Sequence, residues 1–413
     1  MSDIRVLVVD DSVVVRRLVT DSLESDPDIT VVAAAANGKI ALSRLEQVAP
    51  DLVVLDIEMP ELDGLATLSA LRATHPTLPV IMFSTLTERG AAATFDALVR
   101  GASDYVTKPA NVGGVTAARQ RIHDELVPKI RALCGRDGRG LPSATPPAHR
   151  VPAGPSGRVP VGVPGPRRGA DIAVVVVGVS TGGPAALERL FADLLADLPV
   201  PVVVVQHMPP LFTEMLAKRL DAKTPMRVAE GVEGMVLAAG QAWVAPGGLH
   251  MTVVRDGPDV RLHLHEGPPE NSCRPSVDVL FRSAAEVYGP GVLGAVLTGM
   301  GQDGLRGSER IVEAGGSVLA QDQASSVVWG MPRFVAEAGL ADEVLPIERL
   351  GGAIVERVRH GRGGTRCDVA ARRVSPGASE AGAGAAGRAA ARPSASVAGQ
   401  ARTAAERPGG EGR

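Results

Sequence analysis

Short apolar runs alternate with longer amphipathic stretches over much of this 413-residue chain. Runs of β-branched residues bounded by polar turns predict strands, and the periodic stretches between them predict helices. In the N-terminal part we expect five strands, at Arg5–Val9, Ile29–Ala34, Leu52–Leu55, Val80–Phe83 and Tyr105–Val106. Strands that alternate with helices are typical of a parallel sheet covered by crossover helices, so this part predicts an α/β domain.

A second block begins near residue 171 and contains longer, nearly continuous apolar runs. Such runs are typical of parallel strands that are buried on both faces. We predict strands at Ile172–Val179, Val202–Gln206, Val292–Thr298 and Ser317–Ala320, in a doubly wound and mostly parallel sheet. Three further segments look like a small antiparallel insertion, at Gln241–Ala245, Met251–Val254 and Val260–Leu264.

Two segments lack any periodic apolar pattern. Residues 134–169 contain eight prolines and eight glycines, a composition typical of linkers. After residue 360 the chain has no leucine, isoleucine or aromatic residue, so burial cannot offset the entropy lost on ordering it. We therefore predict a domain at residues 1–125, a linker at 126–170, a second domain at 171–358 and a disordered tail at 359–413.

Charge and composition narrow the classes of function. The net charge is −3, but the linker and the tail are rich in arginine, so the two predicted domains are acidic. The whole chain has 2 tryptophans, 2 tyrosines and 6 phenylalanines. Acidic domains with few stacking rings argue against nucleic-acid binding. Apolar runs are too short to cross a bilayer and no signal peptide is evident, so we expect no membrane insertion and a cytoplasmic location.

The cysteines give no sign of a disulfide framework. Cys134, Cys273 and Cys367 are odd in number and far apart. Because no paired ligand spacing is present, we expect reduced thiols and no zinc site.

Carboxylates follow two of the strands in the first block. Asp10 and Asp11 come directly after the first strand, and Asp56 comes directly after the third. The carboxyl ends of parallel strands meet at one edge of a sheet, and clustered carboxylates with phosphate oxygens suit Mg²⁺. Ser84 and Lys108 follow two further strands and add donors for a phosphoryl group. Each acid alone is better explained as a helix cap or loop residue, but the cluster is not.

Three strand ends in the second block carry a serine, a histidine and an aspartate. Ser180 follows the first strand in a glycine-rich turn, and His207 follows the second strand. Asp303 lies in the loop after the Val292–Thr298 strand. A serine hydroxyl needs a base to become a nucleophile, and the base needs a partner that fixes its tautomer.

A glycine-rich turn after a strand more often binds a phosphate or a dinucleotide than it presents a nucleophile. Residues 178–183 lack the G-x-G-x-x-G pattern, and no acidic residue ends the second strand. His207 alone could be a structural histidine, and Asp303 alone could cap a helix. The residues by themselves leave these alternatives open.

The first block resembles the response-regulator receiver family over residues 3–125. The similarity lies in four motifs, VVDDS at 8–12, LDIEMPELDG at 55–64, FST at 83–85 and GASDYVTKP at 101–109. The resemblance implies a flavodoxin-like (βα)5 fold and a histidine kinase as phosphodonor. Tyr105 stands at the family's aromatic switch position, although it could equally be a core ring.

The same resemblance assigns roles to the polar residues at the strand ends. It implies that Asp56 accepts the phosphoryl group and that Asp10, Asp11 and Asp56 hold Mg²⁺. Ser84 and Lys108 are then expected to contact the phosphoryl oxygens.

The second block is similar to the catalytic domain of CheB-type chemotaxis protein-glutamate methylesterases over residues 172–357. The ordered motifs are GVSTGGP at 178–184, QHMPP at 206–210, APG at 245–247, RPSVDVLF at 274–281, LTGMGQDG at 297–304 and VWGMP at 328–332. The resemblance implies a hydrolase that needs no cofactor in the esterase site. It implies that this hydrolase demethylates glutamate esters on methyl-accepting chemotaxis receptors. Relatives also deamidate receptor glutamines, which these residues do not decide.

Carried onto this sequence, Ser180 is the nucleophile, His207 the general base and acid, and Asp303 the orienting carboxylate. The backbone amide of Met300 is expected to contribute to the oxyanion hole, and Thr181 to line the site. Cys273 occupies a position that varies in the family, and we expect it to be inert.

The two resemblances together imply control of the esterase by phosphorylation. Our hypothesis is that the unphosphorylated receiver covers the mouth of the esterase site and that phosphorylation of Asp56 weakens this contact. A receiver joined to a module that binds receptors without turning them over remains the alternative, and a dinucleotide enzyme is less favoured.

Overall fold

The computed structural model describes residues 3–85, 87–109, 114–135 and 171–360. Most of the predicted linker (136–170) and nearly all of the predicted tail (361–413) lie outside the described residues. In the part that is described, no helix is both long enough and apolar enough to cross a membrane.

The N-terminal domain is built on a five-stranded parallel sheet in the order β2-β1-β3-β4-β5. All five predicted strands are confirmed to within one residue at each end. The elements are β1 (Ile4–Val9), α1 (Val13–Leu23), β2 (Ile29–Ala35), α2 (Gly38–Val48), β3 (Leu52–Asp56), α3 (Gly64–Thr74), β4 (Val80–Ser84), α4 (Glu88–Val99), β5 (Asp104–Thr107) and α5 (Val115–Leu133).

Alternating strand residues supply the two apolar layers of this domain. Ile4, Val6 and Val8 of β1 pack in one layer with α1 and α5, whereas Leu7 and Val9 belong to the layer on the other face. Helix α5 continues past residue 125 with its side chains at 126, 127 and 130 buried, so the predicted domain boundary falls inside this helix.

The C-terminal domain contains a seven-stranded parallel sheet in the order β14-β13-β12-β6-β7-β9-β8. A separate antiparallel hairpin, β10–β11, lies beside it. The elements are β6 (Val174–Val179), α6 (Gly183–Ala192), β7 (Val202–Gln206), α7 (Phe212–Lys223), β8 (Arg227–Glu230), β9 (Gln241–Val244), β10 (His250–Asp256), β11 (Asp259–His265), α8 (Val277–Tyr288), a 3₁₀ turn (Gly289–Gly291), β12 (Val292–Val296), α9 (Leu305–Glu313), β13 (Ser317–Gln321), α10 (Met331–Glu337), β14 (Glu343–Leu345) and α11 (Ile347–His360).

The prediction that Gln241–Ala245 belongs to an antiparallel insertion is wrong. Strand β9 pairs parallel with both β7 and β8 inside the main sheet. The loop between Glu230 and Gln241 carries the chain back across the sheet, so the two strands run in the same direction. A hydrophobic pattern reports that a strand is buried but not the direction of its neighbour.

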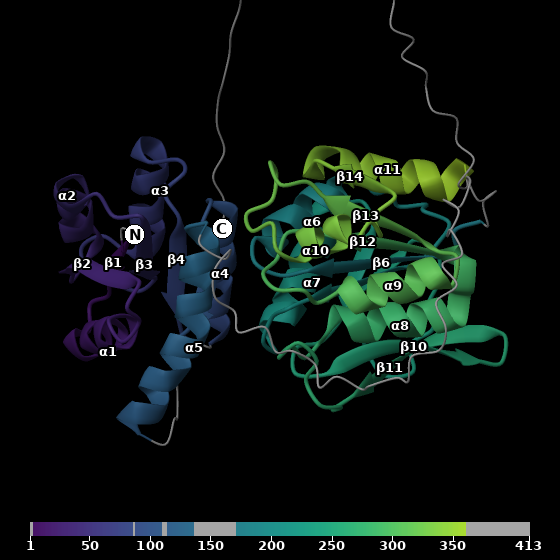
Figure 1. The fold of residues 1–413 in the computed structure, drawn as a ribbon, viewed down its shortest axis with the longest axis horizontal. Helices are drawn as coiled ribbons and strands as arrows, with labels where there is room; N and C mark the ends of the chain where they lie inside the picture. The colour runs from purple at the N-terminus through teal and green to yellow at the C-terminus, as the bar shows by residue number, and fades with distance from the viewer. Residues whose placement is uncertain (1–2, 86, 110–113, 136–170, 361–413) are drawn as a thin grey trace, which may run out of the picture. The chain divides into compact units, whose positions relative to one another are not determined.

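Helices cover both faces of the seven-stranded sheet. Figure 1 shows α8 and α9 on one face and α6 and α11 on the opposite face. From β6 the chain passes to β7 on one side and later returns to β12 on the other, so the strand order reverses at β6. In open α/β sheets, ligands bind at such a switch point, beside the carboxyl ends of the strands.

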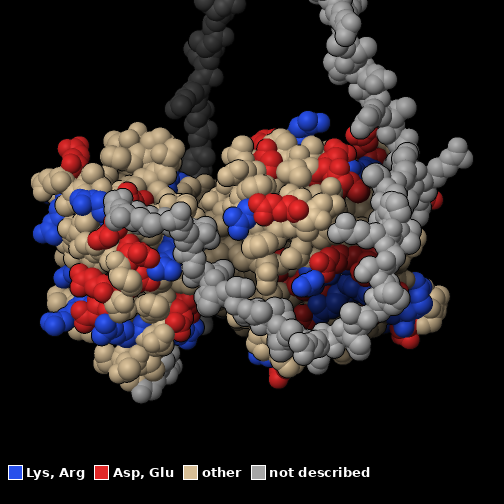
Figure 2. All heavy atoms as spheres, viewed as in Figure 1, with Lys and Arg blue, Asp and Glu red and all other residues tan. Residues whose placement is uncertain are grey.

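Charged side chains are mixed on the visible surface. On the face drawn in Figure 2, acidic and basic side chains are interspersed over the N-terminal domain and form no continuous basic surface.

Candidate functional site

Three carboxylates meet at the carboxyl edge of the N-terminal sheet. Donor oxygens of Asp10, Asp11 and Asp56 all lie within 4.8 Å of one another. The Lys108 ammonium is 2.8 Å from Asp10 Oδ2 and 2.8 Å from Asp56 Oδ1. The structure thus brings these four predicted residues together.

Burial and charge set the protonation of this cluster. Desolvation raises the pKa of Asp56 to about 6, against the opposing hydrogen bond and charge of Lys108, and the charge of Asp10 raises it further. Desolvation opposes protonation of Lys108, but its hydrogen bonds to Asp10 and Asp56 leave its pKa raised. An added cation would relieve the repulsion among the carboxylates, so the donor set fits Mg²⁺.

The cluster opens into a cavity of about 300 Å³ that Asp11, Asp56, Ser84 and Lys108 help to line. Ser84 is buried, and its hydroxyl accepts a 2.7 Å hydrogen bond from Thr94 Oγ1. The lining thus combines carboxylates with a hydroxyl and an ammonium, which suits an anion bound together with a cation.

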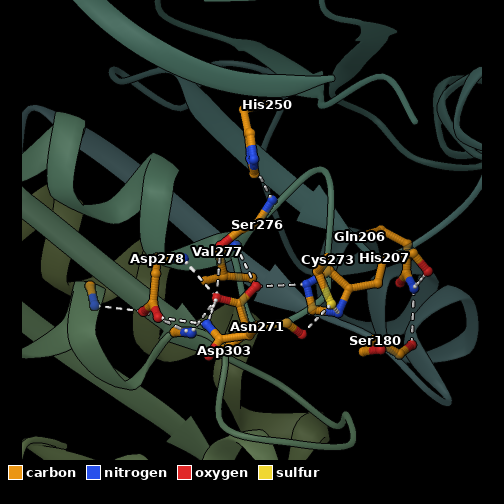
Figure 3. Close-up of polar contacts among 12 residues, drawn as sticks. Ser180, Gln206, His207, His250, Asn271, Cys273, Ser276, Val277, Asp278 and Asp303 are labelled. Carbon is orange, nitrogen blue, oxygen red and sulfur yellow. Dashed lines mark hydrogen bonds and ion pairs between the residues drawn. The ribbon is translucent and has the colours of Figure 1, made fainter. Parts of the chain in front are cut away.

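A second site lies at the switch point of the C-terminal sheet. Ser180 directly follows β6, His207 directly follows β7, and Asp303 lies in the loop between β12 and α9. These are three neighbouring strand ends, because β6 pairs with both β7 and β12. Figure 3 shows His207 between Asp303 on one side and Gln206 and Ser180 on the other.

The turn after β6 is fixed by backbone hydrogen bonds and by a neighbouring side chain. Ser180 N donates to Thr298 O at 3.0 Å, and Gly183 N donates to Ser180 O at 2.8 Å. Gln206 Nε2 also donates to Ser180 O, at 3.0 Å. Gly183 has to be glycine, because a Cβ there would lie 1.9 Å from Gln206 Oε1.

His207 and Asp303 form the predicted histidine–carboxylate pair. His207 Nε2 lies 2.8 Å from Asp303 Oδ2, and both side chains are largely buried. Desolvation alone would lower the pKa of His207, but the hydrogen bond to Asp303 raises it. Desolvation alone would raise the pKa of Asp303, but the hydrogen bond from His207 and those from backbone amides lower it to about 2.

The Ser180 side chain forms no hydrogen bond within the described residues. The predicted nucleophile and the predicted base are therefore neighbours on adjacent strand ends, without a direct hydrogen bond between their side chains in the described structure. Contacts of this kind are often loose without substrate and tighten when it binds.

Comparisons with known proteins identify a family for each of the two domains. A family model described as response regulator receiver domain matches residues 6–119, and one described as CheB methylesterase matches residues 175–354. A protein-glutamate methylesterase/protein-glutamine glutaminase of Nocardioides sp. is 53% identical over 362 residues, covering 88% of this chain and 97% of the relative. The chain belongs to this family.

Two further family members extend the comparison. A protein-glutamate methylesterase/protein-glutamine glutaminase of Trichodesmium erythraeum is 49% identical, covering 87% of this chain and 100% of the relative. The crystal structure of the Thermotoga maritima CheB methylesterase catalytic domain is 39% identical, with a TM-score of 0.45, and covers 45% of this chain and 99% of that chain.

Sequence reasoning missed the residues that hold Asp303 in this methylesterase-family domain. Asp303 Oδ1 accepts hydrogen bonds from Asn271 Nδ2 at 3.0 Å and Ser276 Oγ at 2.9 Å. Its carboxylate also accepts from the backbone amides of Val277 at 2.7 Å and Asp278 at 3.1 Å, at the start of α8. A helix N-terminus stabilises a negative charge. The RPSVDVLF motif at 274–281 was the available signal for Ser276, Val277 and Asp278, although it gave them no role, and Asn271 lies outside it.

Three other residues singled out in the sequence are Met300 and Thr181 in the second domain and Tyr105 in the receiver. The Met300 amide, in a half-buried loop residue, donates no backbone hydrogen bond within the described residues, so it is available to a ligand. Thr181 is buried, and its carbonyl accepts a hydrogen bond from Thr298 Oγ1. Tyr105 in the receiver is also buried, which raises the pKa of its hydroxyl well above the ordinary value.

Proposed function

We propose that this chain hydrolyses glutamate methyl esters on chemotaxis receptors, with Ser180 as nucleophile and His207 and Asp303 as its catalytic partners. The observation that carries the proposal is the 2.8 Å contact between His207 Nε2 and Asp303 Oδ2, beside the strand end that presents Ser180. Membership of the methylesterase/glutaminase family supports the choice of substrate.

The tautomer of His207 follows from its contact with Asp303. Because Nε2–H donates to the carboxylate, the lone pair of the ring is on Nδ1, which is the nitrogen that takes the proton of the Ser180 hydroxyl. Ser180 Oγ then bonds to the ester carbonyl carbon. The protonated His207 returns its proton to the departing methoxide, and methanol leaves. Water next attacks the acyl-enzyme with the same base and releases the glutamate carboxylate.

The developing oxyanion requires hydrogen-bond donors. The amide of Met300, which has no backbone acceptor in the described part of the chain, is one such donor in this proposal. The buried Thr181 follows the nucleophile and lines the site. Deamidation of receptor glutamines would use the same acyl-enzyme, with ammonia as the leaving group.

The receiver supplies the regulation. We propose Asp56 as the phosphoryl acceptor, with Asp10, Asp11 and Asp56 as the ligands of Mg²⁺ and with Ser84 and Lys108 as contacts to the phosphoryl oxygens. Bound Mg²⁺ would neutralise charge on the incoming phosphate. A histidine kinase is the proposed phosphodonor, and phosphorylation is proposed to raise the esterase rate.

The domain division and the location are also proposals. We place the receiver at residues 1–125 together with the rest of α5, the linker between this helix and residue 170, the methylesterase domain at 171–358 and the tail at 359–413. Receptor cytoplasmic segments as substrates imply a cytoplasmic enzyme.

Methanol release from a methylated receptor cytoplasmic fragment tests the esterase directly. We expect release by the wild type and none above background by Ser180→Ala. Ser326→Ala is the matched control, because its hydroxyl donates to the Asp322 carbonyl in another loop. Binding of the fragment without any methanol release by the folded wild type would instead favour a receptor-binding module.

A further inference from the structure

Cys273 brings a thiol to the His207 ring nitrogen that Asp303 does not use. Cys273 Sγ lies 3.6 Å from His207 Nδ1. Donor atoms of His207, Cys273 and Asp303 all lie within 4.8 Å of one another. Figure 3 shows Cys273 beside the His207 ring. Imidazole and thiolate are the preferred ligands of zinc and related metals. Sequence spacing could not predict the pairing of His207 with Cys273, because the two residues are 66 positions apart.

The turn that carries Cys273 is well anchored. Asn271 and Ser272 both have left-handed backbone conformations, with φ of 51° and 63°. Glu270 and Cys273 exchange two backbone hydrogen bonds, of 3.1 and 2.8 Å. Asn271 Nδ2 also donates to Asp303 Oδ1 at 3.0 Å. The thiol is therefore fixed by the same region that fixes the partner of His207.

The distance between the two donor atoms matches the geometry of a tetrahedral zinc ion. With bonds of about 2.3 Å to sulfur and about 2.0 Å to nitrogen, a tetrahedral angle separates the two ligand atoms by about 3.5 Å. The observed separation of Cys273 Sγ and His207 Nδ1 is 3.6 Å. The separation of the two donor atoms is thus the one that a shared tetrahedral ion requires.

We propose that His207 Nδ1 and Cys273 Sγ bind a thiophilic divalent cation, zinc being the best match, and that the bound ion inhibits the esterase. Asp303 is then the outer partner of the site, because a carboxylate that accepts from the second ring nitrogen fixes the tautomer that a metal-bound histidine needs. On binding, the thiol releases its proton to solvent and the sulfur bonds to the ion. Two protein ligands leave the other coordination positions to water, so the ion is exchangeable.

Inhibition is expected because the ion would bind the same ring nitrogen of His207 that acts as the base. Nδ1 is the atom that accepts the Ser180 proton in the proposed reaction, and an ion bound there removes the base. Inhibition therefore rests on the proposed function, whereas binding of the ion does not.

Metal binding is tested on the full chain after chelation and under a reductant that contains no thiol. Excess Mg²⁺ and an Asp56→Asn background keep the receiver carboxylates from contributing. We expect Co²⁺ to give a thiolate-to-cobalt charge-transfer band, and Zn²⁺ to abolish it and to slow alkylation of Cys273. Cys273→Ala should lose the band and weaken Zn²⁺ binding at least about tenfold. Cys134→Ala, which changes the other described cysteine, should retain both.

The alkylation measurement uses unmutated Cys273, so it stays decisive if the Ala variant fails to fold. Alkylation of Cys273 that is insensitive to Zn²⁺, with no cobalt band, would overturn the proposal.

Esterase rates with and without Zn²⁺ are then compared within each variant. A rate ratio that falls at least about tenfold in the Cys134→Ala control and stays near one in Cys273→Ala supports inhibition. Equal sensitivity of the esterase rate to Zn²⁺ in the two variants would overturn the proposed inhibition. An enzyme inactive even without Zn²⁺ but with an intact cobalt band would refute the proposed function alone.

Discussion

Asp303 is satisfied by hydrogen bonds on both oxygens, so its position does not depend on His207 alone. Donors from Asn271, Ser276 and the start of α8 hold the carboxylate in place. An asparagine of the same size would keep the position but not the negative charge, and it would favour the wrong tautomer of His207. We expect Asp303→Asn to lower kcat for methanol release by about 10⁴-fold with a much smaller change in KM.

Asp197→Asn is the control for this substitution, because the Asp197 carboxylate is mostly exposed and, among the described residues, forms an ion pair only with Arg359, at 3.3 Å. Wild-type kcat in a folded Asp303→Asn variant would rule out the proposed role of the carboxylate.

Asp278 gives a pH-dependent prediction. Its carboxylate accepts from the amides of Gly304 and Gly307, at 3.0 and 2.7 Å, and so caps α9. Burial, and then the charge of Asp303, raise the pKa of Asp278 to about 6, whereas an unfolded aspartate titrates near 4. Between about pH 4 and 6 the folded state binds more protons at this residue than the unfolded state.

Lowering the pH through this window should therefore stabilise the wild type relative to Asp278→Asn. Urea unfolding of both proteins at several pH values measures the difference in their free energies of unfolding. A difference that is constant, or that grows as the pH rises, would contradict the raised pKa.

At the residue scale, the sequence predicted the groups at the strand ends but not those that hold them. Asp10, Asp56, Ser180 and His207 could be placed because each lies in or directly after a recognisable strand. The contact of Cys273 with His207 depends on how the loop before α8 packs against β7, which no local pattern encodes.

The turn between β6 and α6 is the element on which presentation of Ser180 depends. Gly182 has a φ of +78°, and a Cβ there would lie 2.6 Å from atoms of Val327. Gly234 has a similar φ of +76° but open space around it. Alanine substitutions at Gly182 and Gly234 therefore separate the effect of backbone strain from the effect of a steric clash.

We expect Gly234→Ala to cost about 1–2 kcal/mol of stability and to leave methanol release intact. Gly182→Ala should cost about 2–5 kcal/mol and also reduce methanol release, because the clash displaces the turn. Chemical denaturation and the methanol assay measure the two effects. Equal losses of stability and activity in both variants would show that the clash with Val327 is unimportant.

Strands were predicted best where they are buried and β-branched. The central strands β6, β7 and β12 follow this rule. The short strands β8 and β14, with charged or exposed residues among four and three positions, were missed. Strand β9 was found but assigned to an antiparallel insertion, since its partners are set by a loop crossing that the pattern does not reveal.

At the scale of the whole molecule, two sites with different chemistry share one chain. The receiver cavity combines carboxylates with an ammonium, as the proposed phosphoryl transfer to Asp56 requires. The proposed esterase site consists of a serine, a histidine and a buried carboxylate. The central claim is that the state of the first site controls the rate of the second.

The measurement that tests this claim most directly is methanol release from a methylated receptor fragment, with and without a small-molecule phosphodonor and Mg²⁺. The wild type, Asp56→Asn and Ser180→Ala are compared side by side. We predict that the phosphodonor accelerates the wild type, that Asp56→Asn or removal of Mg²⁺ with EDTA abolishes the acceleration, and that Ser180→Ala releases no methanol. Equal acceleration of the wild type and Asp56→Asn, or methanol release by Ser180→Ala, would contradict the account.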